Sequence, residues 1–295
     1  MVTKKLTKGV GVEIDRGTQL VNDLKGQFNM LHSMDFYPDL EIEQLLLKQK
    51  ELELEYIKDR FYVPKDHIQF SPSSVDKCKR ELIYKANHMR KDEQAMCPYQ
   101  RRWTRNSTAV HEAVQRDLLY MEKLIPNPAF TVERMKEGKA EGLPAWEKNI
   151  QAYKLFEHNG QKFYLYGMMD GVLNYKDGSR IGFEFKTKST KQDTVHKMKS
   201  GSPSHIKQTV AYSLLFGIDE YLLTYESVAK DEWRANVNAY NDLKPIYVKV
   251  TEKQKLALLD KLAEVTEMYN NGELPDKETS KCFFCPYKVH CFGGE

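Results

Sequence analysis

The sequence lacks any long apolar run: no segment has the roughly 18 consecutive apolar residues that a membrane span needs. Its start, MVTKKLTKGVGVEIDRG, has no apolar core of the kind found in secretory signals. Cysteine is scarce, with five in 295 residues, which argues against a disulfide scaffold. The net charge of +3 is too small to indicate a polyanionic partner by itself. From these absences we expect a cytoplasmic protein with no membrane partner.

The overall composition is typical of a globular protein. Of its residues 41% are hydrophobic and 29% are charged, and the length of 295 residues is enough to bury a substantial core. The sequence has no internal repeat and no low-complexity segment. These features predict one large domain, or one domain with a helical appendage.

Helical patterns dominate the first part of the chain. The first 60 or so residues look helical, most clearly over 39–61, where a Leu/Ile stripe and i,i+4 charge pairs coincide. Ser71 or Ser73 is expected to cap a helix that Pro72 opens and that contains Cys78. A further helix is predicted from Thr104 to Leu124.

Residues 128–190 change to a β-rich pattern. AFTVERM, KFYLYGMMDGVLNY and RIGFEFKTK read as strands, with an Asp-Gly turn between the last two. A helix over 204–217, strands over 220–229 and 245–251, and a helix over 252–272 follow. Strands flanked by helices predict an α/β (α+β) domain built on a mixed central sheet.

Charged residues gather around the central strand. Asp170 is expected at the end of the strand FYLYGMMD, and Glu184 and Lys186 alternate with Phe183 and Phe185 on the next strand. Two carboxylates and the Phe185 carbonyl would form the all-oxygen site that Mg²⁺ or Mn²⁺ prefers. A neighbouring lysine can act on water or on a phosphate. The alternative is a turn aspartate beside an exposed ion pair.

Three more polar residues are compatible with such a site. His111 follows small residues in the helix predicted over 104–124. Gln208 and Tyr212 are four residues apart, so they share one face of a helix. Each of them alone is more typical of a surface or satisfied core residue.

The order of these motifs resembles the RecB-like branch of the PD-(D/E)XK nuclease superfamily: a helical His111, GMMD with Asp170, GFEFK with Glu184 and Lys186, then QTVAY with Gln208 and Tyr212. The resemblance covers about residues 66–295. It implies that His111, Asp170, Glu184 and the Phe185 carbonyl hold a divalent metal. Lys186 would act on the attacking water, and Gln208 and Tyr212 would position the site or the DNA. Lys188 is out of register for catalysis.

A second motif is the C-terminal array CFFCPYKVHC, with Cys282, Cys285 and Cys291. Three close thiolates need a fourth ligand for zinc or for an iron–sulfur cluster, and Cys78, Cys97 or, for zinc, His290 could supply it. The CRISPR-associated RecB-like exonucleases and the AddB nuclease domain, which the layout also resembles, carry one upstream and three C-terminal cysteines. That resemblance implies a structural [4Fe–4S] cluster on Cys78, Cys282, Cys285 and Cys291, with Cys97 left over.

Together with these patterns, the resemblance implies a Mg²⁺- or Mn²⁺-dependent deoxyribonuclease. An exonuclease of recombination, repair or phage DNA processing in a bacterial or phage-infected cell is expected. The alternative is a catalytically idle DNA-binding or recombination-partner module. We expect an N-terminal helical extension (1–65) open to a partner or a second copy, a nuclease domain (66–275) and a cysteine-rich tail (276–295). The residues expected to meet DNA are Arg101, Arg102, Trp103, Arg105, Lys188 and Lys191.

Overall fold

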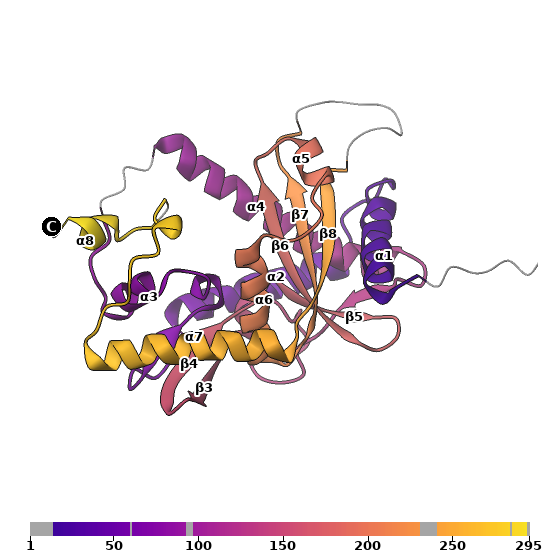
Figure 1. Ribbon diagram of the computed structural model, residues 1–295. Helices are drawn as coiled ribbons and strands as arrows, with labels where there is room; N and C mark the ends of the chain where they lie inside the picture. Colours follow the sequence, from indigo (N-terminus) through magenta and orange to yellow (C-terminus); the bar gives the residue numbers. More distant parts are fainter. Residues whose placement is uncertain (1–13, 60, 93–96, 231–240, 284, 294–295) are drawn as a thin grey trace, which may run out of the picture.

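The computed structural model describes residues 14–59, 61–92, 97–230, 241–283 and 285–293 (Figure 1). The helices are α1 (Arg16–Leu31), α2 (Leu40–Lys58), α3 (Lys79–Ala86), α4 (Pro98–Leu124), α5 (Gln192–His196), α6 (Pro203–Phe216), α7 (Glu252–Asn271) and α8 (Lys288–Phe292). The strands are β1 (Ile68–Phe70), β2 (Phe130–Val132), β3 (Ala152–His158), β4 (Gln161–Gly167), β5 (Gly171–Tyr175), β6 (Arg180–Lys188), β7 (Glu220–Ser227) and β8 (Leu243–Lys249). No helix within these ranges is long and apolar enough to cross a membrane.

The strands form two mixed sheets. The five-stranded sheet has the order β2-β5-β6-β7-β8, in which β6 and β7 are parallel and the other pairs antiparallel. The three-stranded sheet has the order β1-β4-β3, with β1 parallel to β4. The predicted α/β class with a mixed sheet flanked by helices is confirmed, and the second sheet is an addition to it.

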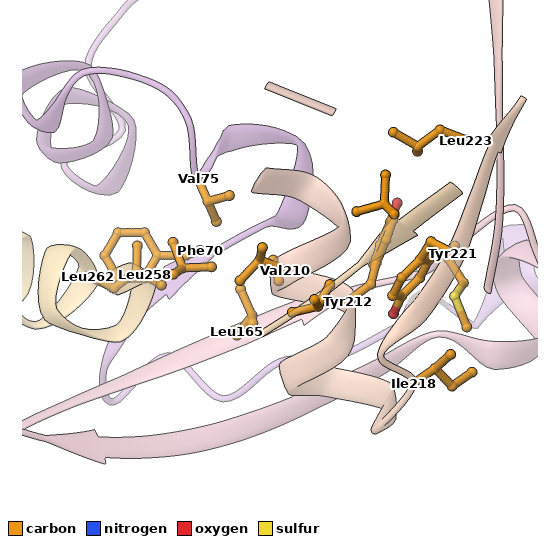
Figure 2. Close-up of a cluster of buried hydrophobic side chains, with 14 of the residues drawn as sticks. Phe70, Val75, Leu165, Val210, Tyr212, Ile218, Tyr221, Leu223, Leu258 and Leu262 are labelled. Carbon is orange, nitrogen blue, oxygen red and sulfur yellow. The ribbon is translucent and has the colours of Figure 1, made fainter. Parts of the chain in front are cut away.

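Helices cover both faces of the larger sheet. Figure 1 shows α1 and α6 on opposite sides of it, with α7 running along the three-stranded sheet. One hydrophobic core joins α1 and α4 to β5 and β6, and the other joins α6 and α7 to β4 and β7. Figure 2 shows part of the second core, where Val210 and Tyr212 of α6 lie between Leu165 of β4 and Tyr221 of β7. Strand β6 therefore lies between two packed layers.

The alternation of β6 divides its side chains between these layers. Phe183 and Phe185 pack into the core with α1 and α4, while Glu184 points to the α6 side, where Gln208 contacts it. At Gly182 the neighbouring strand comes very close, because a Cβ there would lie 2.2 Å from Cε1 of the buried Tyr221. Only glycine fits this point of the strand pair without moving the ring.

Helix starts differ from the sequence predictions at two places. Ser71 and Pro72 begin a 3-10 turn, η1 (Pro72–Ser74), rather than the α-helix expected there. Cys78 is the N-cap of α3, not a residue within the helix, because its thiol accepts the backbone N–H of Glu81. Helix α4 begins at Pro98, six residues before the expected start at Thr104, and Cys97 is its N-cap.

Other elements match the predictions closely. Helices α2, α6 and α7 and strands β6, β7 and β8 lie where their patterns indicate. Gly178 takes a φ of +86° in the expected Asp-Gly turn between β5 and β6. Strand β3 and the short elements β1, α5 and α8 were not predicted. The helical expectation for residues 1–13 lies outside the described residues.

Candidate active site

Asp170 reaches the site from a link between the two sheets. The strand expected to end at Asp170 stops at Gly167, where a Cβ would lie 2.7 Å from Cδ of Pro72. Residues 168–170 then cross from β4 to β5. Because Gly171 of β5 pairs with Phe183 of β6, Asp170 lies beside β6, and its Oδ2 accepts the Phe185 N–H at 2.8 Å.

Glu184 is the most deeply buried charged group of the site, with 1% of its surface exposed. Its Oε1 lies 2.5 Å from Lys186 Nζ and accepts a hydrogen bond from Gln208 Nε2 at 2.9 Å. Its Oε2 is buried with no hydrogen-bond partner among the described residues. Burial and the nearby charge of Asp170 raise the pKa of Glu184, and Lys186 and His111 oppose that rise only in part.

Lys186 remains a cation at this site. Burial alone would lower the pKa of its ammonium group, but the charges of Glu184 and Asp170 outweigh that effect and raise the pKa. The predicted alternative of an exposed ion pair is therefore wrong, since Glu184 is buried and only a quarter of the Lys186 side chain is exposed.

His111 of helix α4 contacts two carboxylates, those of Asp170 and Glu147, which lie in different loops. Its Nε2 lies 3.0 Å from Asp170 Oδ2, and its Nδ1 lies 3.3 Å from Glu147 Oε1. Burial disfavours the imidazolium, but hydrogen bonds to Asp170 and Glu147 outweigh burial and raise the pKa of His111 to about 10. The ring also meets Phe185 edge-on, with centroids 5.7 Å apart.

Gln208 and Tyr212 form one unit on α6. A single turn of helix places them together, and Gln208 Nε2 donates to Tyr212 Oη at 2.7 Å as well as to Glu184. Both side chains are buried. Burial and the negative charges of Glu184 and Asp170 raise the pKa of Tyr212, so its hydroxyl stays neutral.

Two neighbouring residues were missed by the sequence reasoning. Gln115 lies one turn after His111 on α4, and its Nε2 donates to Glu147 Oε1 at 3.1 Å. The four-residue spacing from His111 could have identified it. Glu147 starts the short 3-10 turn η2 (Glu147–Ile150), and no periodicity in the sequence marks it.

The residues predicted to meet DNA lie on α4, at the end of β6 and at the start of α5. Arg101, Arg102, Trp103 and Arg105 are exposed on the first half of α4, and Lys191 is exposed at the start of α5. A hydrogen bond of 2.5 Å between Ser107 and Thr187 joins α4 to the end of β6. Lys188 follows directly on β6, with its Nζ 5.3 Å from the centre of the Tyr225 ring.

The cysteine tail returns to α3 at the other end of the molecule (Figure 1). Cys285 packs with Tyr84 of α3, and Arg80 Nη1 lies 3.7 Å from Cys291 Sγ. Burial raises the pKa of Cys78, and the negative charges of Glu81 and Glu278 add to that rise. Burial raises the pKa of Cys285 to about 11. Cys97 is exposed at the start of α4.

Neither group of candidate ligands is arranged around a common centre. In the part of the chain that the structure describes, no three or more His, Cys, Asp and Glu side chains are placed to hold a metal ion. At the acidic site the reason is visible, because Asp170 is paired with His111 and Glu184 with Lys186. Each carboxylate that would bind a cation is instead paired with a basic side chain.

The fold and these contacts define a mixed α/β protein with a buried acidic centre beside a lysine. A family model described as the PD-(D/E)XK nuclease superfamily matches residues 68–292, and the chain belongs to that superfamily. No curated protein sequence matches the chain.

Several solved structures align with the chain at low identity. One is entitled "Crystal structure of SSO0001", with 14% identity, a TM-score of 0.43, and coverage of 88% of this chain and 98% of that one. Another is an alkaline exonuclease (LHK-Exo) from Laribacter hongkongensis, with 13% identity, a TM-score of 0.41, and coverage of 69% and 90%. The same exonuclease in complex with dAMP aligns with 13% identity, a TM-score of 0.41, and coverage of 68% and 88%.

Proposed function

We propose that this nuclease-superfamily chain is a metal-dependent deoxyribonuclease of the RecB-like branch. The observation that carries the proposal is the convergence of Asp170, Glu184 and Lys186 around the main chain of Phe185. A structural ion pair would serve equally well on the protein surface, whereas this one is buried, and its carboxylate oxygen Oε2 has no hydrogen-bond partner in the described part of the chain. Such a charge distribution is typical of a catalytic centre.

The donor set fits a hard divalent cation such as Mg²⁺ or Mn²⁺. The ligands that we propose are the carboxylates of Asp170 and Glu184, the imidazole of His111 and the Phe185 carbonyl. The unpartnered Glu184 Oε2 supports this assignment, because a cation would satisfy it and would offset the repulsion between the two carboxylates. When bound there, the cation would polarise the scissile phosphate and acidify a water molecule.

The chain's own residues carry the other parts of the reaction. Lys186 keeps its proton and can donate a hydrogen bond to the phosphate or to the attacking water. Gln208 holds Glu184 Oε1, and Tyr212 in turn holds Gln208, so this pair keeps the carboxylate in place. In the hydrolysis a water molecule loses a proton as its oxygen bonds to phosphorus, the bond from phosphorus to the leaving deoxyribose oxygen breaks, and that oxygen takes up a proton.

DNA would approach along the rim formed by α4 and the end of β6. Its positive side chains, Arg101, Arg102, Arg105, Lys188 and Lys191, suit the phosphate backbone. Trp103 is 47% exposed, which leaves its ring available for stacking on a base. The Ser107–Thr187 hydrogen bond holds the two parts of this rim together.

We propose further that Cys78, Cys282, Cys285 and Cys291 hold a structural [4Fe–4S] cluster, with zinc as the other possible occupant. The support is that the tail and α3 come together although Cys78 precedes the three tail cysteines by about 200 residues. The cluster would fasten the tail (276–295) to the nuclease domain (66–275). The N-terminal region (1–65) exposes Leu40, Leu47 and Leu54 on α2, a surface that a second copy or a recombination partner could cover.

An exonuclease acting on DNA ends or single strands in recombination, repair or phage DNA processing is the specific form of this proposal. The test is hydrolysis of end-labelled linear DNA and of covalently closed circular DNA, each with Mg²⁺, Mn²⁺ or EDTA. We expect metal-dependent release of nucleotides from linear DNA and little cleavage of circles. DNA binding without hydrolysis under every condition would favour the idle DNA-binding module instead.

A further inference from the structure

The imidazole of His111 is held from both sides. On one side its Nε2 lies 3.0 Å from Asp170 Oδ2, and on the other its Nδ1 lies 3.3 Å from Glu147 Oε1. The side chain is largely buried, with 22% of it exposed, so solvent does not compete freely for either nitrogen. The orientation of the ring is therefore set by two carboxylates from two different loops.

Glu147 is itself fixed by contacts with the same region. Its backbone N–H donates to the Met169 carbonyl at 2.7 Å, which ties it to the residue before Asp170. Its Oε1 also accepts from Gln115 Nε2 at 3.1 Å, and that same nitrogen lies 3.5 Å from the Asp170 carbonyl. Glu147 is thus held by its side chain to helix α4, and by its backbone to the segment that leads into β5.

The backbone of Glu147 is in an unfavourable conformation for a glutamate. Its φ is +44°, in the left-handed region that glycine and asparagine adopt more readily. A glycine would satisfy the turn with less strain, but it could not reach His111. The strained backbone and the contact to Nδ1 together indicate that the side chain has a task at this position.

We propose that Glu147 is a positioning residue for His111, an inference that rests on the proposed metal-dependent function. When His111 binds a cation as the neutral imidazole, Glu147 accepts the hydrogen of Nδ1 and so favours the tautomer whose Nε2 carries the lone pair. Nε2 is the nitrogen that faces Asp170, so it is the one available to a cation shared with that carboxylate. Carboxylates that hold the second nitrogen of a ligating histidine commonly control metal affinity in this way.

The first test measures Mn²⁺ binding to the full chain without DNA, by calorimetry. We expect Glu147→Ala to raise the dissociation constant about 10- to 100-fold, the usual effect of removing such a partner. Glu147→Gln should lose less, because its amide oxygen can still accept from Nδ1. Glu112→Gln is the matched control, since it removes one negative charge from the next residue after His111 and should bind Mn²⁺ as the wild type does.

Glu147→Gly separates positioning from a merely structural role. It relieves the left-handed backbone, so its unfolding midpoint should equal or exceed that of the wild type, while its Mn²⁺ affinity falls as in Glu147→Ala. Equal Mn²⁺ affinities in the wild type, Glu147→Ala and Glu147→Gly would overturn the positioning role of Glu147, but not the proposed metal dependence. Absence of Mn²⁺ binding by the wild type would overturn this inference and the proposed metal dependence together.

A spectroscopic measurement tests the tautomer directly. Long-range ¹H–¹⁵N spectra of the Mg²⁺-loaded protein distinguish the two neutral imidazole tautomers, and His111→Asn assigns the signal among the eight histidines. At a Mg²⁺ concentration that just saturates the wild type, we expect the Nδ1–H form in the wild type. In Glu147→Ala we expect a partial loss of that form, because the weaker site is then partly empty. A single unchanged Nδ1–H tautomer in Glu147→Ala would contradict the proposal.

Discussion

Replacing Gln208 by leucine tests the proposed support of the acidic centre. Gln208 Nε2 donates to Glu184 Oε1 at 2.9 Å and to Tyr212 Oη at 2.7 Å, and all three side chains are buried. A hydrogen bond to a charged group contributes about 1.5–3 kcal/mol and one to a neutral group about 0.5–1.5 kcal/mol. Gln208→Leu should therefore lower the free energy of unfolding by about 2–4 kcal/mol.

Tyr212→Phe removes only the second of these bonds and should cost about 1 kcal/mol. The double variant should lose less than the sum of the single losses, because no buried hydroxyl is left without a partner. Urea unfolding gives the three free energies, and initial cleavage rates show whether Glu184 loses its position. Strictly additive losses, or a loss below about 0.5 kcal/mol for Gln208→Leu, would refute this reasoning.

Three further predictions follow from individual contacts. Gly182→Ala should destabilise the fold by about 1–3 kcal/mol in urea unfolding, because the added Cβ would lie 2.2 Å from Tyr221 Cε1; wild-type stability would contradict the tight packing of β6 on β7. Burial and the charges of Lys186 and Lys188 lower the pKa of His205 from 6.5 to about 4 in the folded protein. As the pH falls through this interval, the unfolded chain takes up a proton that the folded protein does not, so the free energy of unfolding should decrease. His205→Gln should flatten that part of the stability–pH curve, and an unchanged curve would contradict the assignment of this pH dependence to His205. In an anaerobic preparation Cys285→Ser should abolish the visible absorbance of an iron–sulfur cluster while Cys97→Ser retains it; a colourless wild-type protein that contains zinc would decide for zinc.

The parts of the site that the sequence could predict depend on short periodicities. Alternation along β6 places Glu184 and Lys186 together, and the spacing of four places Gln208 beside Tyr212 on α6. These relations hold inside a single strand or helix, so they do not depend on the rest of the fold. The roles of these residues remain predictions.

The parts that could not be predicted depend on how separate elements meet. The apolar run FYLYGMMD hides the change of sheet at Gly167, because residues buried in either sheet give the same pattern. Glu147 becomes a neighbour of His111 only through the path of the chain between β2 and β3. Upstream of Cys78, the residues Ser71 and Pro72 are typical of a helix start and therefore predicted a helix that begins too early. Cysteine is not a typical N-cap residue, so the sequence did not indicate that α3 begins after Cys78.

The most direct test of the central claim is single-turnover cleavage of end-labelled DNA with Mn²⁺ by Glu184→Ala, Lys186→Ala and Lys188→Ala. Glu184→Ala should abolish cleavage, and Lys186→Ala should slow the chemical step by about 100-fold or more, as the loss of one charge-stabilising donor does. Lys188→Ala, two residues further along the same strand face, should weaken DNA binding but keep a cleavage rate close to the wild type when the enzyme is saturating. Metal-dependent cleavage that survives unchanged in both Glu184→Ala and Lys186→Ala would contradict the account.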